Sequence, residues 1–380
     1  MVDPLSRRKS GYISSLDGWR AVAILGVMIY HSGPFVVGGV SLFPVQMLGR
    51  FGVQLFFAIS GILICTRLLD EEDQRGRISL RAFYQRRLFR IQPAALMFLG
   101  MALLLAFSGV IPLDPKSFWT ALLSVRNYYD AGDAPGNGYT AHFWSLAVEE
   151  HFYLILPFLL LLLRGRHRVV WFGVITVLSI LWTFHVSHGA DLGPKLWHTD
   201  FQISWLFVPS WLALMVRLPS VRTVFVKYLP SGPIVWIGVC GTLVLGLRFH
   251  NRFLFPFLVV WLSLMVFSTI FHPKSWSGRF LELYPLRAIG RISFSLYLWQ
   301  QLFCRNLAES TPESTWLGSL QHRPQSFLLP FVFAVLSYFL VEKPMIRLGH
   351  QLSPPVTAGH EDLSSPPLGE PSTTVAKASL

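Results

Sequence analysis

Residues 143–163 read FWSLAVEEHFYLILPFLLLLL and combine the length of a membrane span with two adjacent carboxylates, Glu149 and Glu150. Crossing roughly 30 Å of hydrocarbon takes about 20 mostly apolar residues in a helix, so this stretch is long enough to span a bilayer. Charged side chains inside a membrane are costly and mark functional sites. The stretch therefore predicts a transmembrane helix that carries part of a site.

Further stretches of the chain are apolar and of similar or slightly shorter length. They cover residues 16–32, 49–69, 89–108, 169–187, 201–216, 233–249, 253–271, 289–306 and 326–341. The first and the fifth of these are short for a span, so about nine or eleven helices remain alternatives. We predict an all-α integral membrane protein, a bundle of about ten transmembrane helices.

The composition agrees with a membrane protein. Of the 380 residues, 52% are hydrophobic and only 14% are charged, whereas soluble domains carry about 25% charged residues. The net charge of +12 does not indicate nucleic-acid binding, because the basic residues lie in short runs between apolar stretches. Cys65, Cys240 and Cys304 lack the spacing of a metal site or a disulfide framework, so no metal is expected.

The distribution of basic residues predicts the orientation. If both termini are cytoplasmic, all but eight of the 32 Lys and Arg fall on the cytoplasmic side, as the positive-inside rule requires. The eight on the outer side are Arg50, Lys116, Arg126, Lys195, Arg248, Arg252, Arg305 and Arg323. We expect a multi-pass protein of the cell (inner) membrane, whose first apolar stretch is a retained helix because no small-residue cleavage site follows it.

Two domains are predicted from the change in composition along the chain. Residues 1–348 form the transmembrane domain, and residues 349–380, rich in Pro, Ser and Thr, form a disordered cytoplasmic tail. The longest outer loop covers residues 110–142 and is built of turn-forming residues at its centre, 130–138. No internal repeat is recognisable, whereas many secondary transporters are built from repeated halves.

The stretch 16–32 contains two ionisable residues, Arg20 and His31. Eleven positions at about 100° per residue bring both side chains onto one face of a helix, about 16 Å apart along its axis. This pair predicts a polar path from the cytoplasmic surface into the outer half of the membrane. The alternative is that Arg20 extends to the interface and that His31 caps the helix before Gly33 and Pro34.

The two carboxylates of residues 143–163 lie between two histidines, His142 and His151. Neighbouring residues of a helix point about 100° apart, so at most one of Glu149 and Glu150 can aim at a common centre. The alternative is an acidic first turn that complements the helix dipole. The convergence of several ionisable residues at one depth favours a site.

Basic residues end the second cytoplasmic loop in residues 83–93. Arg87 and Arg90 are three positions apart and share a helical face. Paired guanidinium groups match phosphate oxygens, so a nucleotide-type cosubstrate fits there; contact with anionic lipid is the alternative.

Ser60 and Gly61 place a small polar pair in mid-membrane. Helix packing is favoured there over a catalytic serine, because no G-x-S-x-G elbow surrounds Ser60.

These motifs together resemble acyltransferase family 3, the membrane-bound O-acyltransferases that modify bacterial surface polysaccharides and some antibiotics. The resemblance extends to about Arg347. The matching stretches are SLDGWRA at 15–21 followed by His31, GVQLFFAISG at 52–61, RRLFR at 86–90, WSLAVEE at 144–150, GRISFSLYLW at 290–299 and VEKP at 341–344. A set of motifs in this order, with matching topology, is more specific than any one of them.

The resemblance implies an O-acetylation reaction in which acyl-coenzyme A, usually acetyl-coenzyme A, approaches from the cytoplasm as the cosubstrate. The acceptor is expected to be a hydroxyl of a carbohydrate, such as a lipid-linked glycan or a polysaccharide. Arg20, His31 and Glu149 are assigned to catalysis, and Arg86, Arg87, Arg90 and Ser60 to donor binding. Gln54, Gln300 and His151 depart from the common family residues, so acceptor specificity is not carried over.

The resulting hypothesis is that neutral His31 takes the proton of the acceptor hydroxyl and that Glu149 stabilises the imidazolium. Glu150 is the alternative partner of His31, and a covalent acyl-histidine is a variant of the mechanism. The competing class is a transporter that uses an intramembrane His/Glu proton relay. The acceptor, the acyl group and the oligomeric state are not readable from the sequence.

Overall fold

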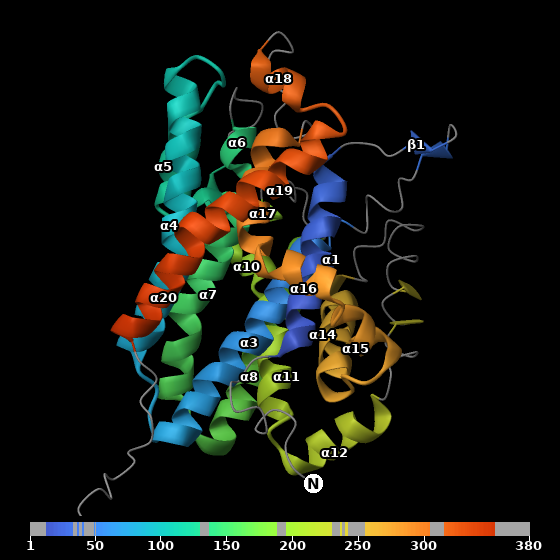
Figure 1. The fold of residues 1–380 in the computed structure, drawn as a ribbon. Helices are drawn as coiled ribbons and strands as arrows, with labels where there is room; N and C mark the ends of the chain where they lie inside the picture. Colours follow the sequence, from blue (N-terminus) through green and yellow to red (C-terminus); the bar gives the residue numbers. More distant parts are fainter. Residues whose placement is uncertain are drawn as a thin grey trace, which may run out of the picture.

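The computed structural model describes residues 13–32, 36–37, 40–41, 49, 51–129, 137–187, 195–229, 236–237, 240–241, 255–304 and 315–353. These residues form a bundle of helices (Figure 1). A short antiparallel ribbon joins β1 (Val36–Val37) to β2 (Val40–Ser41). Of the predicted helix at 233–249, only 236–237 and 240–241 are described. The tail predicted at 349–380 is described only up to residue 353, and there the helix Lys343–Leu352 runs past its expected start at Gly349.

Within the described part of the chain, 5 helices are long and apolar enough to cross a membrane. They are α3 (Gly52–Arg75), α4 (Leu80–Phe107), α6 (Gly138–Ala141) continued by α7 (Phe143–Leu162), α8 (Gly165–Ser187), and α19 (Gln325–Ser337) continued by η4 (Tyr338–Glu342) and α20 (Lys343–Leu352). This length and apolarity define a multi-pass membrane protein. The count of about ten helices stays a prediction.

The remaining predicted spans that fall on described residues are shorter or broken. The stretches 16–32 and 253–271 correspond to α1 (Ser14–His31) and α14 (Phe255–Phe271). The stretch 201–216 is divided between α10 (Thr199–Gln202) and α11 (Ser204–Met215), and α11 meets α12 (Pro219–Tyr228) at a bend of 106°. The stretch 289–306 is interrupted at Ile292, between α16 (Tyr284–Arg291) and α17 (Ser293–Phe303).

We name the two ends of the bundle after α12 and α18, which lie at opposite ends (Figure 1). The further short helices are α5 (Pro115–Leu122), η1 (Arg126–Tyr128), α15 (Trp276–Leu281) and α18 (Trp316–Leu320). The helix α5 begins at Asp114, whose carboxylate accepts a hydrogen bond from the backbone N–H of Ser117 at 2.8 Å, followed by a proline at its first position. Both features are typical of a helix start.

The helix α1 lies inside the bundle, where it packs against α3, α14, α16 and α17. Close backbone contact makes this possible. A Cβ added at Gly290 of α16 would lie 1.8 Å from the backbone oxygen of Asp17, and one added at Gly61 of α3 would lie 2.5 Å from that of Leu206. Glycine at such crossings lets membrane helices approach closely. The tight crossing of α1 and α16 sets the position of the polar residues on α1.

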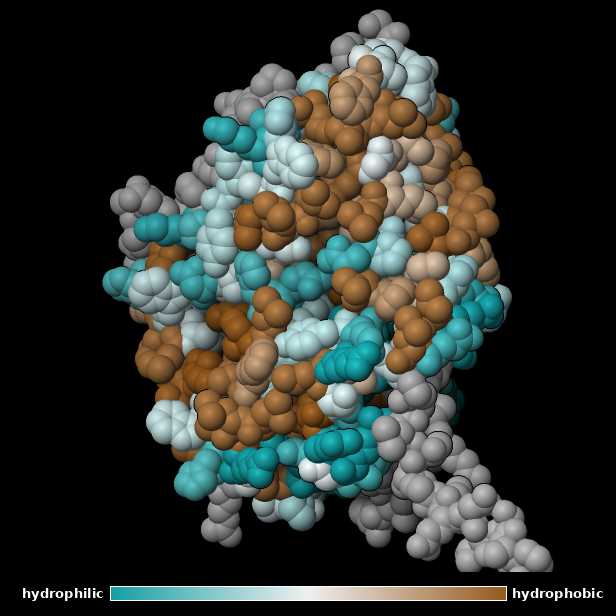
Figure 2. Space-filling view, turned by 90° about the vertical axis from the view of Figure 1, so that its left-hand side faces the viewer, coloured by the Kyte–Doolittle hydropathy of each residue, from teal (hydrophilic) through white to brown (hydrophobic). Residues whose placement is uncertain are grey.

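The outer surface of the long helices is apolar. Exposed side chains include Leu88, Leu96 and Leu104 of α4 and Phe158 and Leu162 of α7. Figure 2 shows two hydrophobic areas on one side of the molecule, separated by a band of hydrophilic residues, with further hydrophilic residues along its lower rim, which is the α12 end. Lipid chains can solvate a surface of this kind, whereas a soluble protein of this size rarely exposes it.

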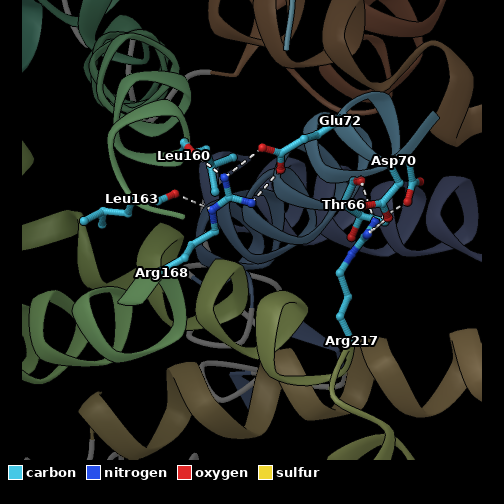
Figure 3. A network of polar contacts seen from close by, with 8 residues as sticks. Thr66, Asp70, Glu72, Leu160, Leu163, Arg168 and Arg217 are labelled. Atoms are coloured by element: carbon cyan, nitrogen blue, oxygen red, sulfur yellow. Dashed lines mark hydrogen bonds and ion pairs between the residues drawn. The ribbon is translucent and has the colours of Figure 1, made fainter. Parts of the chain in front are cut away.

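Ion pairs tie the helices together at the α12 end (Figure 3). Arg168 of α8 donates to the two carboxylate oxygens of Glu72 at 2.6 and 3.1 Å, and also to the carbonyl oxygens of Leu160 and Leu163. These carbonyl groups lie at the C-terminal end of α7, where backbone C=O groups have no N–H partner within the helix. The end of α3 is thereby joined to α7 and α8, and Arg217 joins it to the α11–α12 bend through Asp70 and Asp73.

Candidate active site

Arg20 and His31 lie on one face of α1, as the helical spacing predicts. Arg20 lies in the second turn and its Nη1 is 3.2 Å from Oδ1 of Asp17. His31 is the last residue of the helix, about 16 Å further along the axis. Each belongs to a separate group of polar side chains, so the candidate site has two levels.

The level of Arg20 is a group of charged residues that we call the arginine cluster. Its members are Arg20 of α1, Arg67 of α3, Arg87 and Arg90 of α4, Glu149 of α7 and Glu342 of η4. They lie close enough for Coulomb interactions between them: Arg20 with Arg90 and Glu149, Arg87 with Glu149 and Arg67, and Glu342 with Arg90 and Arg20. Asp17 and Glu150 lie at its edge, through Arg20 and Arg87 respectively. The four guanidinium groups gathered here offer paired hydrogen-bond donors, which suit an anionic ligand.

Glu149 is held in place by two hydroxyl groups. Ser60 of α3 and Tyr153, one turn further along α7, both donate hydrogen bonds to its Oε1. The guanidinium carbon of Arg87 lies 5.0 Å from the centre of the Tyr153 ring and 5.7 Å from that of Phe83. A cation over an aromatic face is attracted by the ring. The predicted residues Ser60, Arg87 and Glu149 are thus brought together.

Arg86 lies apart from this arrangement. Its Nη2 is 3.1 Å from Oε2 of Glu71, whose other oxygen accepts from Arg75 at 2.9 Å and from the backbone N–H of Ser79 at 3.1 Å. Ser79 precedes α4, and its hydroxyl accepts from the N–H of Ala82. Arg86 therefore helps to fix the α3–α4 connection, from which α4 carries Arg87 and Arg90 into the bundle.

Glu342 was not among the residues selected from the sequence. It is 2% exposed and its Oε2 accepts a hydrogen bond of 2.8 Å from Ser295 of α17, which also contacts Ser337. It ends the π-helical turn η4, and such turns are frequent at functional sites. The signal that could have found Glu342 is the one used for Glu149, a carboxylate at the edge of an apolar stretch.

The level of His31 is a second group, which we call the histidine cluster: His31, His142, Tyr297 and Gln300. Nδ1 of His31 is 2.9 Å from Oε1 of Gln300. The amide nitrogen of Gln300 donates to the backbone oxygen of Tyr297 at 3.4 Å and to Oε1 of Gln301 at 3.2 Å. The Gln300 oxygen facing His31 can only accept, so Nδ1 carries the hydrogen and Nε2 carries the lone pair. This is the tautomer that a general base requires at Nε2.

His142 lies at the break between α6 and α7 and packs among aromatic rings. The centre of its ring is 5.0 Å from that of Phe98 and 5.6 Å from that of Tyr297. The hydroxyl of Tyr297 donates to the backbone oxygen of His142 at 3.1 Å and lies 2.6 Å from Oγ of Ser145. His142 and His31 are near enough for a Coulomb interaction. The sequence indicated His142 only as a neighbour of the carboxylates.

The predicted pairing of His31 with Glu149 or Glu150 is wrong in this structure. Among the described residues, His31 bonds to Gln300 and Glu149 bonds to Ser60 and Tyr153. The residue of α7 that reaches the level of His31 is His142, and Glu149 lies seven positions, about 10 Å, further along the helix axis.

The neighbours of Glu149 on α7 have different partners. Glu150 interacts with Glu149 and Arg87 and also with Gln92 of α4. His151 lies 2.6 Å from Oγ1 of Thr199 and stacks on Tyr128. Three consecutive residues of a helix point about 100° apart, so they cannot converge on one centre. Of this run, Glu149 receives the hydrogen bonds of Ser60 and Tyr153, and Glu150 lies at the edge of the arginine cluster.

Comparison with known proteins identifies the class of membrane protein. The model of acyltransferase family 3, described as an acyltransferase domain, matches residues 13–342, so the chain belongs to this family. No solved structure matches it.

Curated relatives come from Staphylococcus aureus. "Putative O-acetyltransferase SACOL0978" of strain COL is 31% identical over 373 residues, covering 90% of this chain and 58% of the relative. "O-acetyltransferase OatA" of strain NCTC 8325 / PS 47 is 26% identical over 368 residues, covering 89% of this chain and 58% of the relative. The chain thus spans little more than half the length of these relatives.

Proposed function

We propose that this protein is an O-acyltransferase that moves an acyl group, most simply acetyl, from acyl-coenzyme A to a hydroxyl of a carbohydrate acceptor. The observation that carries the proposal is the presence of two distinct polar levels along α1. The arginine cluster suits the phosphates of a donor, and the histidine cluster offers a base about 16 Å away along the helix axis. A long, flexible pantetheine arm can connect two such points.

Donor binding is assigned to the arginine cluster. Arg87 and Arg90 share a face of α4, and Arg20 and Arg67 lie near Arg90. Guanidinium groups bind phosphate oxygens through paired hydrogen bonds. The ion pairs of Arg86 and Glu71 hold the start of α4, so we assign Arg86 to the support of this site. Ser60, through Glu149, supports it from α3.

The orientation follows from the basic residues at the α12 end. Arg164 and Arg168 begin α8, and Arg217 and Lys227 flank α12. By the positive-inside rule, this end faces the cytoplasm, where acyl-coenzyme A is made. We therefore assign the α18 end to the outer side and both ends of the transmembrane domain to the cytoplasm. The carbohydrate or lipid-linked glycan approaches His31 from the outer side of the inner membrane.

The reaction at His31 needs a base because an alcohol is a weak nucleophile at neutral pH. Nε2 of His31 takes the proton of the acceptor hydroxyl while its oxygen attacks the thioester carbonyl carbon. The C–S bond then breaks, and the imidazolium returns the proton to the departing thiolate. Gln300 keeps Nδ1–H bonded throughout, which is the orienting role that a carboxylate has in a Ser-His-Asp triad.

The test uses purified protein in lipid vesicles with acetyl-coenzyme A labelled in the acetyl group. Wild-type protein should consume the thioester when a glycan acceptor extract is present, and mass spectrometry of the extract should show one added acetyl group. His31→Ala should abolish transfer, and His167→Ala, an exposed position at the start of α8, should not. A transporter without bond-making chemistry would leave the thioester intact. That result, or full transfer by His31→Ala, would contradict the proposal.

A further inference from the structure

His142 is a buried histidine whose ring nitrogens make no hydrogen bond to any described residue. Its residue is 2% exposed, and neither Nδ1 nor Nε2 has a hydrogen-bond partner within the part of the chain that the structure describes. Buried polar side-chain atoms in native proteins are nearly always hydrogen-bonded, so each exception calls for an explanation. A ligand that the ring receives during function is one such explanation.

The surroundings of His142 hold its ring in one place. The ring of Phe98 meets it edge to face, and Tyr297 packs on it at 5.6 Å. Its backbone oxygen accepts hydrogen bonds from Tyr297 at 3.1 Å and from Ser145 at 3.2 Å. These contacts fix the start of α7, and a ring fixed in this way is preorganised for a ligand.

His142 and His31 flank the same turn of α17. Tyr297 contacts His142, and Gln300, three positions later on the same helical face, bonds to His31. The two imidazoles are also close enough for a Coulomb interaction. A group that is bound at Nε2 of His31 therefore lies at the same level of the bundle as the free ring nitrogens of His142.

The other donors of the histidine cluster are already in use. Nδ1–H of His31 bonds to Gln300, and the amide of Gln300 donates to Tyr297 and Gln301. The hydroxyls of Tyr297 and Ser145 bond to each other and to the backbone of His142. A neutral imidazole always carries one N–H. Within the histidine cluster, His142 thus supplies the free donor.

We propose that His142 is a second catalytic residue, whose ring N–H donates a hydrogen bond to the carbonyl oxygen of the acyl group during its transfer at His31. This rests on the proposed function. When the acceptor oxygen attacks, the carbonyl oxygen gains negative charge, which it gives up again as the C–S bond breaks. A donor fixed in a site of low polarity stabilises that charge more than the ground state. No proton leaves His142 in this role.

The test compares three variants in the labelled acetyl-coenzyme A assay. His142→Phe keeps an aromatic ring and removes both nitrogens, and His142→Gln restores an N–H donor. Trp299→Phe is the matched control, because Nε1 of Trp299 is also buried without a partner and its ring also contacts Phe98, at 5.7 Å. We expect His142→Phe to lower kcat by about 100- to 1000-fold, as the loss of one such donor does. The KM for the donor should stay unchanged.

The kcat of His142→Gln should be at least about tenfold higher than that of His142→Phe. Trp299→Phe should keep the wild-type kcat. Near wild-type kcat in His142→Phe, or an equal loss in Trp299→Phe, would overturn the inference. If His142→Phe fails to accumulate as folded protein, His142→Gln alone tests the inference. A kcat of His142→Gln as low as that of His31→Ala would then refute the donor role. Absence of thioester consumption by the wild-type protein refutes the proposed function instead, so the two failures are distinguishable.

Discussion

Ser60 of α3 donates a hydrogen bond to the carboxylate of Glu149 in α7, although the two residues are 89 positions apart in the chain. Tyr153 donates to the same oxygen. Hydrogen bonds from two hydroxyl groups hold this carboxylate in one orientation. Glu149 can therefore balance the charge of Arg20 and Arg87, which lie near it. The contact joins two helices at the centre of the arginine cluster.

Glu149→Gln should impair the protein strongly, because it removes the negative charge and leaves Arg20 and Arg87 to repel each other and Arg90. A hydrogen bond to a charged group contributes about 1.5–3 kcal/mol, and about 1.4 kcal/mol is a tenfold change in rate. We expect kcat/KM for acetyl-coenzyme A to fall by about 100-fold. Glu150→Gln is the matched comparison, since it also removes one carboxylate near Arg87, but the hydrogen bonds of Ser60 and Tyr153 go to Glu149. Equal effects of the two variants would contradict the assignment.

Ser60→Ala should have a smaller effect of the same kind, because Tyr153 still donates to Glu149. We expect a loss of about tenfold in kcat/KM, and a larger loss when Tyr153→Phe is added. The double-mutant cycle measures whether the two hydroxyls act on one carboxylate. Strictly additive effects of Ser60→Ala and Tyr153→Phe would show that they act independently of Glu149.

Gln300 should control the reactivity of His31 without affecting the binding of the donor. Gln300→Leu removes the acceptor of Nδ1–H, so the ring loses its fixed orientation and tautomer. We expect kcat to fall by about 10- to 100-fold with little change in the KM for acetyl-coenzyme A. Gln300→Glu keeps the acceptor and should retain far more activity than Gln300→Leu. Similar kcat values for both variants would argue against the orienting role.

Hydropathy alone located the apolar parts of the helices well but not their starts. The stretch 143–163 agrees with α7 (Phe143–Leu162) almost to the residue. In contrast, α4 begins at Leu80, well before the predicted stretch 89–108. The residues between include Arg81, Arg86 and Arg87, which lower the local hydropathy, so hydropathy does not detect the start of the helix. Ser79 marks that start, because its hydroxyl accepts a hydrogen bond from the N–H of Ala82. Hydropathy also does not reveal the break at Ile292, which divides the predicted stretch 289–306.

The candidate site was predictable within a helix but not between helices. The common face of Arg20 and His31 follows from helix geometry, since the angle between positions on one helix is fixed. Which residue of α7 lies opposite His31 depends on the axial offset of two helices, and nothing in the spacing along the chain sets that offset. This is why Glu149 was predicted at a level where the structure places His142, and why Glu342 was missed.

Arg87 and Arg90 should determine the affinity for the donor. Replacing both by Ala removes two of the four cations of the arginine cluster, so the phosphates of acetyl-coenzyme A lose their partners. We expect the KM for acetyl-coenzyme A to rise by at least about tenfold and by more than kcat falls. Free coenzyme A should lose affinity as an inhibitor in parallel. Arg164→Ala, at an exposed position before α8, is the control. An unchanged donor KM in the double variant would refute phosphate binding.

Gly290 should be essential for the position of α16 against α1. A Cβ at this residue would lie 1.8 Å from the backbone oxygen of Asp17, so Gly290→Ala must push the two helices apart. Asp17 carries the ion pair with Arg20, and the shift therefore reaches the arginine cluster. Overpacking of this kind costs about 1–3 kcal/mol or more, and we expect a lower thermal midpoint in detergent together with reduced transfer. Gly100→Ala in α4 is the matched control, because a Cβ there meets nothing within 4 Å. If Gly290→Ala melts with Gly100→Ala and wild-type protein, the close crossing of α1 and α16 is not what holds Asp17 and Arg20 in place.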